Sequence, residues 1–574
     1  MRPSNIASSL ALAASTSAAA PDHCSQDFFA SLLPDNATLL FAESVSQNST
    51  FHVSPANIAY PISPTNLPAA CALQVNITSS PTSAYSFGLF LPDPSTYNDR
   101  ILGVGNGGFA GGVNWLDMAA GLHYGFASWS TDTGHNSTSG DLTWALNNEE
   151  RRSDWGHRAI HGSAIMARQV AEAYYEAEAR YAYFSGCSTG GRQAIREIQL
   201  HPETFDGVLA GAPAWWTDRL QTWSLWVGLL NLPTNSSSRI PPEAFPMIAK
   251  EVMAQCDWQD GLKDGIISDS AGCRFVPEAL LCSSEEELND QSTAQCLNPH
   301  QLATLKQLYN DYRGADNAFI FPGLELGSEE QWGFLIGGDK PSTYGSEFVQ
   351  DFVLDDPSWS TDCYNSTIPF LASERRPGNA SATEFDLGPF HARGGKLLHH
   401  HGSSDGLIPT GSSVYFHAQV QQTLQPRGIE LDDFYRFFVV PGMQHCMGTP
   451  KDVSAPWYFA GPNQAGALGN GTYSTPGYSD AAHDELLALM AWVEDGRAPD
   501  MIVATEWKDQ DVANGVLRQR PICPWPKQAR FTNEGSPDEA QNWKCEDVHG
   551  EHQPGYEGYE SDGEQQEQQQ ADAY

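Results

Sequence analysis

Residues 181–193 read YAYFSGCSTGGRQ, and this stretch decides the fold. The aromatic run Tyr181–Ser185 is typical of a buried strand, and the residues from about Arg192 (RQAIREIQLH) favour a helix. Between them, Gly186-Cys187-Ser188-Thr189-Gly190 fits the pattern G-x-S-x-G. Its glycines leave room for a tight strand-to-helix turn that exposes the serine hydroxyl. The stretch therefore predicts a strand, a sharp turn carrying a nucleophilic Ser188, and a helix.

The surrounding chain alternates short apolar runs with stretches of helical character. Strands are expected at residues 85–91 and 101–104, a helix at 159–180, and the last core strands at 394–402 and 434–442. Strands that alternate with helices favour a parallel sheet covered on both faces. Together with the serine turn, this order predicts an α/β fold of the α/β-hydrolase type.

Two later motifs supply an acid and a base. Gly402-Ser403-Ser404-Asp405-Gly406 also fits G-x-S-x-G, but Leu-Ile-Pro follows and does not start a regular helix smoothly. We therefore interpret it as the loop of the catalytic acid, Asp405. His445 follows the next expected strand, and the order Ser, Asp, His is that of α/β-hydrolases. The alternative is that Ser188 begins an ordinary turn and His445 is a loop histidine; strand, helix and chain order favour the triad.

An oxyanion hole requires backbone N–H groups without obstructing side chains. One donor is expected from Thr189, directly after the nucleophile. The other is expected from Gly107 or Gly108, within the glycine-rich run 103–112. That run also fits the dinucleotide fingerprint G-x-G-x-x-G. We reject the dinucleotide interpretation because no convincing helix follows, and no acidic residue lies at the usual distance on a second strand.

The eleven cysteines leave at least one thiol unpaired within the chain. Short sequence separations favour the pairs Cys24–Cys71, Cys256–Cys273, Cys282–Cys296 and Cys523–Cys545. Cys187 precedes Ser188 and Cys446 follows His445, so a meeting of serine and histidine would bring these two cysteines within disulfide range. The alternative is that both are small buried residues. With the bridge formed, Cys363 is the odd thiol.

Composition favours a secreted glycoprotein. The net charge of −39 would repel nucleic acid. Residues 1–20 resemble a signal peptide, and no later apolar run is long enough to cross a membrane. The cysteine content suits an oxidising compartment. Glycosylation sequons begin at Asn36, Asn48, Asn76, Asn136, Asn235, Asn365, Asn379 and Asn470.

We expect a catalytic domain in two parts, residues 21–214 and 390–545, with a disulfide-braced insertion at 215–389 that lies over the sheet. Residues 546–574 are acidic, rich in Gln and poor in apolar residues, so we expect a disordered tail. Within the insertion, three carboxylates in the glycine-containing stretch 256–266, which Cys273 closes, suit calcium, although such acidic turns are also commonly just solvated. The run His399–His401 is expected to be structural, because side chains alternate between the faces of a strand.

These motifs resemble the fungal tannase and feruloyl esterase family. The similarity rests on FSGCSTGGRQ at 184–193, VLAGAPA at 208–214, the Asp405 loop and Gln444-His445-Cys446, and it spans about 24–545. The resemblance implies a Cys187–Cys446 disulfide, a lid domain and structural Ca²⁺. The implied calcium ligands are Asp257, Asp260, Asp264 and the carbonyl oxygens of Leu262 and Ile266.

The resemblance also implies the substrate class. Members of this family hydrolyse esters of plant phenolic acids, so the expected partner is a phenolic ester linked to a polysaccharide or a tannin. We expect a serine esterase for feruloyl esters. A tannase that cleaves galloyl esters is the alternative within the class, and an inactive carbohydrate-binding or scaffold homologue is the alternative outside it.

Overall fold

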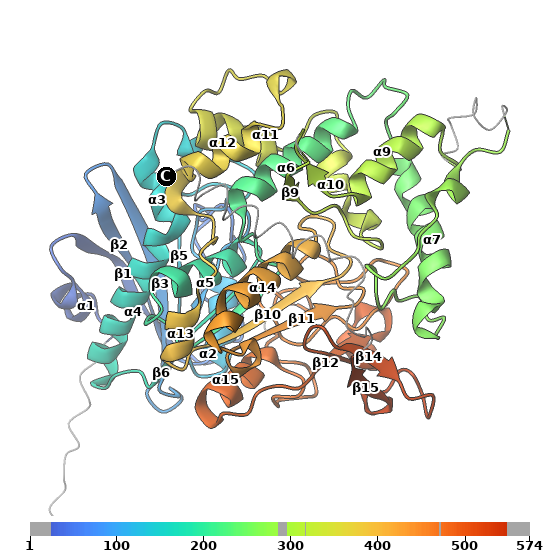
Figure 1. Ribbon diagram of the computed structural model, residues 1–574. Helices are drawn as coiled ribbons and strands as arrows, with labels where there is room; N and C mark the ends of the chain where they lie inside the picture. Colours follow the sequence, from blue (N-terminus) through green and yellow to red (C-terminus); the bar gives the residue numbers. More distant parts are fainter. Residues whose placement is uncertain (1–23, 285–294, 316, 470–471, 548–574) are drawn as a thin grey trace, which may run out of the picture.

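A nine-stranded mixed sheet runs through the molecule (Figure 1). The computed structural model describes residues 24–284, 295–315, 317–469 and 472–547. The predicted signal peptide, the sequon at Asn470 and residues 548–574 of the predicted tail lie outside these ranges. In spatial order the strands are β1 (Ala37–Val45), β2 (Ala70–Ser80), β3 (Ser83–Pro92), β5 (Ala127–Thr131), β4 (Arg100–Val104), β6 (Tyr181–Cys187), β7 (Gly207–Gly211), β10 (Lys396–Gly402) and β11 (Tyr435–Val440).

The sheet is antiparallel at one edge and parallel at its centre. β1, β2, β3 and β5 pair with antiparallel neighbours, whereas every pairing from β5 through β4 to β11 is parallel. The carboxyl ends of parallel strands lie at one edge of a sheet, so the loops after β6, β10 and β11 are brought together there. These are the loops that carry Ser188, Asp405 and His445.

Strand alternation divides the core into two hydrophobic layers. Leu397 packs in one buried cluster with residues of α4 (Ala159–Tyr175), α5 (Thr189–Leu200) and α14 (Gly411–Leu424). Leu398, the next residue, packs in a second cluster with residues of α2 (Trp115–His123) and α15 (Glu485–Asp495). Successive side chains of a strand point to opposite faces, so helices cover the sheet on both sides, as expected for an α/β fold.

The segment between β7 and β10 is mainly helical. It contains α6 (Thr217–Leu230), α7 (Phe245–Cys256), α9 (Pro299–Tyr309), α10 (Gly333–Ile336), α11 (Thr343–Glu347), α12 (Ile368–Arg375), α13 (Gly388–Ala392), β8 (Tyr312–Arg313) and β9 (Phe319–Phe321). In Figure 1, α6, α9, α10, α11 and α12 lie together along the upper side of the molecule. Buried residues such as Trp223 and Trp332 belong to the same cluster as Leu397 of the sheet. The segment therefore shares a core with the sheet, and the domain boundaries stay a prediction.

The first helix and the last four strands that the structure describes lie outside the main sheet. A short helix, α1 (Gln26–Leu32), precedes β1, and two hairpins follow α15. The hairpins are formed by β12 (Ile502–Trp507) with β13 (Val516–Ile522), and by β14 (Gln528–Phe531) with β15 (Trp543–Glu546). None of the helices in the described ranges is long and apolar enough to cross a membrane.

Two local expectations need correction. A helix does follow the glycine-rich run, because α2 begins at Trp115 and the Asn114 side chain caps it by accepting the N–H of Asp117. The short length of α2, nine residues, and Gly121 within it weaken the helical pattern in the sequence. The helix expected at 159–180 ends instead at Tyr175, where Glu176 takes a left-handed conformation with φ 54°.

Candidate active site

Ser188 occupies a strained turn between β6 and α5. Its φ of 62° and ψ of −122° lie outside the regions that non-glycine residues usually adopt. The close approach of two backbones requires the neighbouring glycines, since a Cβ on Gly186 would lie 2.5 Å from the carbonyl of Gly190. A Cβ on Gly105 would lie 2.6 Å from the Cα of Gly190. The turn therefore has the strained geometry of a nucleophile elbow.

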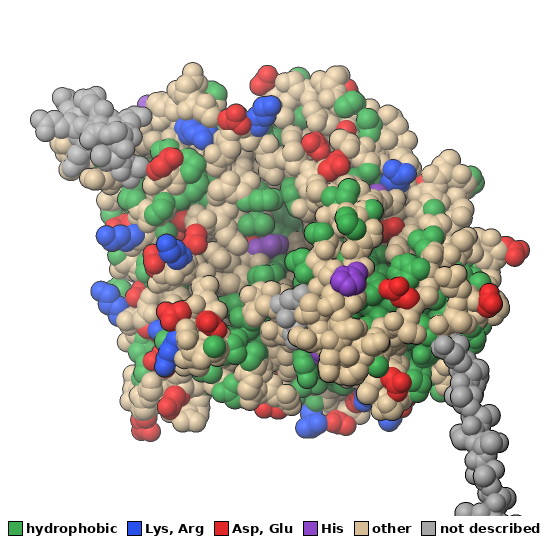
Figure 2. Space-filling model, turned by 180° about the vertical axis from the view of Figure 1, so that it is seen from behind, with side chains coloured by type: hydrophobic (Ala, Val, Ile, Leu, Met, Phe, Trp, Pro, Cys, Tyr) green, Lys and Arg blue, Asp and Glu red, His purple; other side chains and the backbone are tan. Residues whose placement is uncertain are grey.

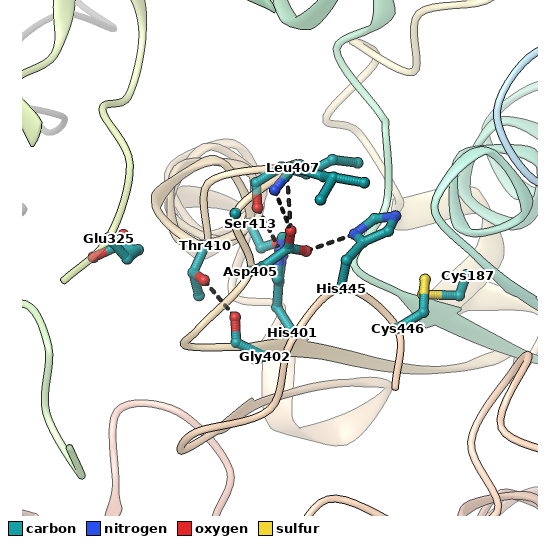
Figure 3. A network of polar contacts seen from close by, with 12 residues as sticks. Cys187, Glu325, His401, Gly402, Asp405, Leu407, Thr410, Ser413, His445 and Cys446 are labelled. Carbon is teal, nitrogen blue, oxygen red and sulfur yellow. Dashed lines mark hydrogen bonds and ion pairs between the residues drawn. A yellow bond between two sulfur atoms is a disulfide. The ribbon is translucent and has the colours of Figure 1, made fainter. Parts of the chain in front are cut away.

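Asp405 and His445 meet at the carboxyl ends of β10 and β11. His445 Nδ1 lies 2.7 Å from Asp405 Oδ2 (Figure 3). A carboxylate accepts hydrogen bonds, so the proton resides on Nδ1 and Nε2 keeps its lone pair. This is the tautomer that a general base for a serine hydroxyl requires.

The carboxylate of Asp405 is buried and fully hydrogen-bonded. Its Oδ1 accepts the N–H groups of Leu407 and Ile408, each at 2.9 Å. Burial alone would raise the pKa of Asp405, but the electrostatic attraction of the His445 imidazole and hydrogen bonds from His401 and His445 outweigh it and hold the pKa below its ordinary value. Asp405 is therefore an anion that orients His445 and does not take its proton.

His401 also contacts Asp405, and sequence reasoning missed this role. His401 Nε2 lies 3.0 Å from Asp405 Oδ2 and 2.9 Å from the carbonyl oxygen of Ile408 (Figure 3). The expected alternation does hold, because His399 and His401 contact Ser413 while His400 contacts Glu485. The available signal was the position of His401 at the end of the strand that carries the acid loop.

Gln331 links the acid loop to the histidine loop. Its Oε1 accepts the N–H of Gly406 at 3.0 Å and the N–H of His445 at 3.2 Å. Gln331 belongs to the segment between β7 and β10, so that segment helps to position both loops. Sequence reasoning missed this contact, since nothing near Gln331 in the sequence marks it.

A cavity of about 450 Å³ lies over the nucleophile. Ser188, His445 and the disulfide Cys187–Cys446 line it, together with the apolar residues Ile58, Leu220, Phe334, Leu335, Leu407, Ile408 and Met447. Neutral polar groups come from Tyr60, Thr138, Ser139, Gln221, Ser224, Tyr344 and Asn463. Figure 2 shows a hollow on one face of the molecule, bordered by hydrophobic side chains with a histidine beside it.

Ser188 and His445 face the same cavity without a direct hydrogen bond. In the described part of the chain, no hydrogen bond joins Ser188 Oγ to the imidazole, and both side chains line the cavity wall. Such bonds are often long in the free enzyme and tighten when substrate binds.

The expected oxyanion donors lie at the cavity, but one of them is already engaged. Thr189 is the first residue of α5, where backbone N–H groups lack intrahelical partners. The N–H of Gly107 donates to the Tyr60 hydroxyl at 2.8 Å. Desolvation raises the pKa of Tyr60, so this hydroxyl keeps its proton. Gly108 lines the same cavity, and no hydrogen bond among the described residues engages its N–H, so it is the remaining candidate for the second donor.

The structure contains five disulfides, and they join the pairs expected from the sequence. These are Cys24–Cys71, Cys187–Cys446, Cys256–Cys273, Cys282–Cys296 and Cys523–Cys545. Cys363 is a free, exposed thiol. The Cys187–Cys446 bridge closes a loop of 259 residues and ties the nucleophile turn to the histidine loop.

The predicted calcium loop offers oxygen ligands that are bonded to protein groups. Asp257 Oδ1 accepts the N–H of Gly265 at 2.9 Å, Asp260 Oδ2 accepts the Ser268 hydroxyl at 2.6 Å, and Asp264 pairs with Arg520. Among the described residues, no group of three or more His, Cys, Asp or Glu side chains is arranged to hold a metal ion. The donor chemistry suits calcium, whereas Arg520 competes for Asp264.

The sequence matches the family described as "Tannase and feruloyl esterase" over residues 71–546. "Probable feruloyl esterase B-1" of Aspergillus flavus is 30% identical over 477 residues, covering 83% of this chain and 86% of that protein. "Probable feruloyl esterase B-1" of Aspergillus terreus is 32% identical over 452 residues, covering 79% and 82%.

Solved structures agree with these relatives. The crystal structure of feruloyl esterase B from Aspergillus oryzae has a TM-score of 0.82 at 30% identity, covering 91% of this chain and 99% of that one. The tannin acyl hydrolase from Aspergillus niger has a TM-score of 0.72 at 20% identity, covering 93% and 96%, which supports the fold alone. The chain thus belongs to the tannase and feruloyl esterase family, whose members are carboxylic ester hydrolases.

Proposed function

We propose that this chain is a secreted serine esterase that hydrolyses feruloyl and related hydroxycinnamoyl esters, with Ser188 as nucleophile, His445 as base and Asp405 as orienting acid. One observation carries the proposal: His445, whose Nδ1 lies 2.7 Å from Asp405, shares a cavity with a serine held in a strained turn. Each residue follows a different parallel strand, so three distant segments supply one chemical array.

The reaction is acyl transfer in two steps. Ser188 Oγ attacks the ester carbonyl while His445 Nε2 takes its proton, and the N–H groups of Thr189 and Gly108 hold the oxyanion. His445 then protonates the departing alcohol. Water attacks the acyl-enzyme in the second step, with His445 again as base. Asp405 remains ionised throughout and stabilises the imidazolium.

The cavity supports a feruloyl preference over a galloyl one. No Asp, Glu, Lys or Arg of the described ranges lines it, and its walls are largely apolar. A hydroxycinnamoyl group presents an aromatic ring on an apolar vinyl spacer, with few hydroxyls. A galloyl ring carries three hydroxyls, each needing a buried partner. The relatives named feruloyl esterase B support the same choice.

We also propose that calcium binds the disulfide-closed loop between Cys256 and Cys273. The carboxylates of Asp257, Asp260 and Asp264 and the carbonyl oxygens of Leu262 and Ile266 are the proposed ligands. Hard oxygen donors of this kind suit calcium, which would order the loop and take no part in the chemistry. Its binding requires Asp264 to give up part of its contact with Arg520.

Secretion completes the proposal, with a plant cell-wall polysaccharide as the expected carrier of the ester. The disulfides support an oxidising compartment. The sequon residues Asn36, Asn48, Asn136, Asn235 and Asn365 are exposed, which leaves them accessible to glycosylation.

Labelling with a fluorophosphonate tests the catalytic assignment independently of the acyl group. The proposal predicts a single covalent adduct on Ser188, found by mass spectrometry, and none in Ser188→Ala. A folded wild-type protein that stays unlabelled would refute the serine mechanism.

A further inference from the structure

Two histidines, His401 and His445, lie within hydrogen-bond distance of Asp405 Oδ2, and only His445 faces the cavity. His445 lines the cavity and His401 is buried, with no exposed surface. The two imidazoles approach the same oxygen at 2.7 Å and 3.0 Å (Figure 3). His401 therefore contacts Asp405 from inside the core, on the side away from the cavity.

A chain of buried polar groups continues from His401 into the core. Ser413 Oγ, on α14, lies 2.7 Å from His401 Nδ1 and 2.8 Å from His399 Nε2. His399 Nδ1 lies 2.8 Å from the hydroxyl of Tyr435, on β11. All four side chains have essentially no exposed surface, so bulk water supplies none of these bonds.

The groups at the two ends of the chain, an acceptor at one end and a donor at the other, determine where the protons lie. His401 Nε2 faces a carboxylate and the carbonyl oxygen of Ile408, so it must donate. At the far end, the Tyr435 hydroxyl has no hydrogen-bond partner among the described residues other than His399 Nδ1. A buried hydroxyl proton needs an acceptor, so Tyr435 donates to His399.

The intermediate protons then follow in one direction. His399 Nδ1 accepts, so its proton lies on Nε2 and is donated to Ser413 Oγ. Ser413 in turn donates its single proton to His401 Nδ1. Both histidines are neutral in this arrangement. Burial lowers the pKa of His399 well below its ordinary value, and burial raises that of Tyr435, in agreement with these protonation states.

We propose that His401 is a positioning residue of the catalytic centre, held in its Nε2-protonated tautomer by the chain Tyr435–His399–Ser413 so that it always donates to Asp405. This inference rests on the proposed serine mechanism. The His401 N–H occupies a lone pair of Asp405 Oδ2 on the side away from the cavity. This hydrogen bond fixes the carboxylate in place and reduces the negative charge that Oδ2 presents to His445. The basicity of His445 is thereby tuned as well as its orientation.

Other titratable groups face this region. They are His399 on β10, His417 on α14, Tyr435 on β11, His445 after β11, and Glu325, whose Oε1 accepts the N–H of Gly411. His400 points to the opposite face of β10, toward Glu485. Asp405 receives hydrogen bonds from His401 and His445 and not from the others.

The test compares His401→Phe with His401→Gln, whose side-chain amide can still donate toward Asp405. Phe should lower kcat/KM about 10- to 100-fold, whereas Gln should recover most of it. Without the donor, the charge on Asp405 stabilises the His445 imidazolium more strongly. The acid limb of the pH profile should therefore move to higher pH in His401→Phe, by about half a unit or more, and stay in place in His401→Gln.

The matched control is His417→Phe with His417→Gln. His417 lies one turn from Ser413 and packs on the Tyr435 ring, with centroids 5.2 Å apart, but lies outside the hydrogen-bonded chain. Neither control should move the acid limb. The pH dependence of fluorophosphonate labelling is the second readout, because it reports the same base without any acyl specificity. A wild type that labels but hydrolyses no phenolic ester would refute the proposed substrate and leave this test intact.

An acid limb that stays in place in a folded His401→Phe would overturn the inference, and so would equal rate losses in the Phe and Gln variants. Should His401→Phe fail to fold, Ser413→Ala decides. It removes the donor to His401 Nδ1, together with the acceptor of the His399 Nε2 proton, and should shift the limb in the same direction by a smaller amount. An unchanged profile in that variant would overturn the inference.

Discussion

Cys187 and Cys446 are joined by a disulfide whose Cα atoms lie 5.9 Å apart, so the residue before Ser188 is bonded to the residue after His445. The bridge lies at the wall of the cavity and connects the loops that follow β6 and β11. Small displacements of a nucleophile from its base are costly for the rate. The bond therefore sets the spacing between Ser188 and His445.

Replacing both cysteines, as Cys187→Ser with Cys446→Ser, should lower kcat/KM about 100-fold, because the two catalytic loops lose their common anchor. Steady-state kinetics on a simple ester measures the loss, and circular dichroism checks the fold. The control removes Cys282–Cys296, which pairs residues outside the lining of the cavity, and should retain activity. Equal activity in the two double variants would contradict the anchoring role.

Tyr60→Phe should lower kcat about tenfold with little change in KM. The hydroxyl accepts the N–H of Gly107 and so holds the loop that presents Gly108 to the oxyanion. Tyr344→Phe is the control, since Tyr344 lines the same cavity and its hydroxyl also lies close to Gly108 without accepting the Gly107 N–H. An unchanged or higher kcat in Tyr60→Phe would show that the Tyr60 hydroxyl does not hold the loop of Gly107 and Gly108 in its active conformation.

Acid should weaken the fold partly through Asp405. Its pKa is lower in the folded chain than in the unfolded one, so its contribution to stability is complete above the unfolded pKa of about 4 and is lost as the pH falls toward the folded value. The stability advantage of the wild type over Asp405→Asn, measured by urea unfolding, should therefore shrink between pH 5 and pH 3. A constant difference across that range would show that the carboxylate pKa is not lowered by folding.

Calcium removal should lower the thermal unfolding midpoint by about 2–5 °C, since an ion that binds only the folded chain stabilises it. Differential scanning fluorimetry with and without EDTA measures the shift, and added CaCl₂ should restore the midpoint. Asp257→Asn should abolish the response. Asp269→Asn, in the same disulfide-closed loop but outside the proposed ligands, should keep it. An identical midpoint in EDTA and calcium would refute the calcium proposal.

Local patterns in the sequence were enough to predict most of the fold and to propose the triad residues. The strand, glycine turn and helix around Ser188 are adjacent in the sequence. Asp405 and His445 each follow a short apolar or aromatic run that indicates a strand. Parallel pairing of β6, β7, β10 and β11 then brings the three loops to one edge. No knowledge of side-chain packing was needed for this step.

The supporting residues could not be predicted because they depend on contacts between distant segments. Gln331 reaches Gly406 and His445 from the helical segment between β7 and β10, and Tyr60 reaches Gly107 from a loop before β2. His401 was visible as part of a histidine run, but its partner Ser413 lies on the next helix. Periodicity places a side chain on a face and does not identify what it contacts there.

The most direct test is hydrolysis of methyl ferulate and methyl gallate side by side, by the wild type and by Ser188→Ala. The wild type should turn over methyl ferulate with a higher kcat/KM than methyl gallate. Ser188→Ala should lose this activity while keeping its fold. Preference for methyl gallate would contradict the feruloyl assignment and favour a tannase. Ferulate turnover that persists in Ser188→Ala would contradict the catalytic centre described above.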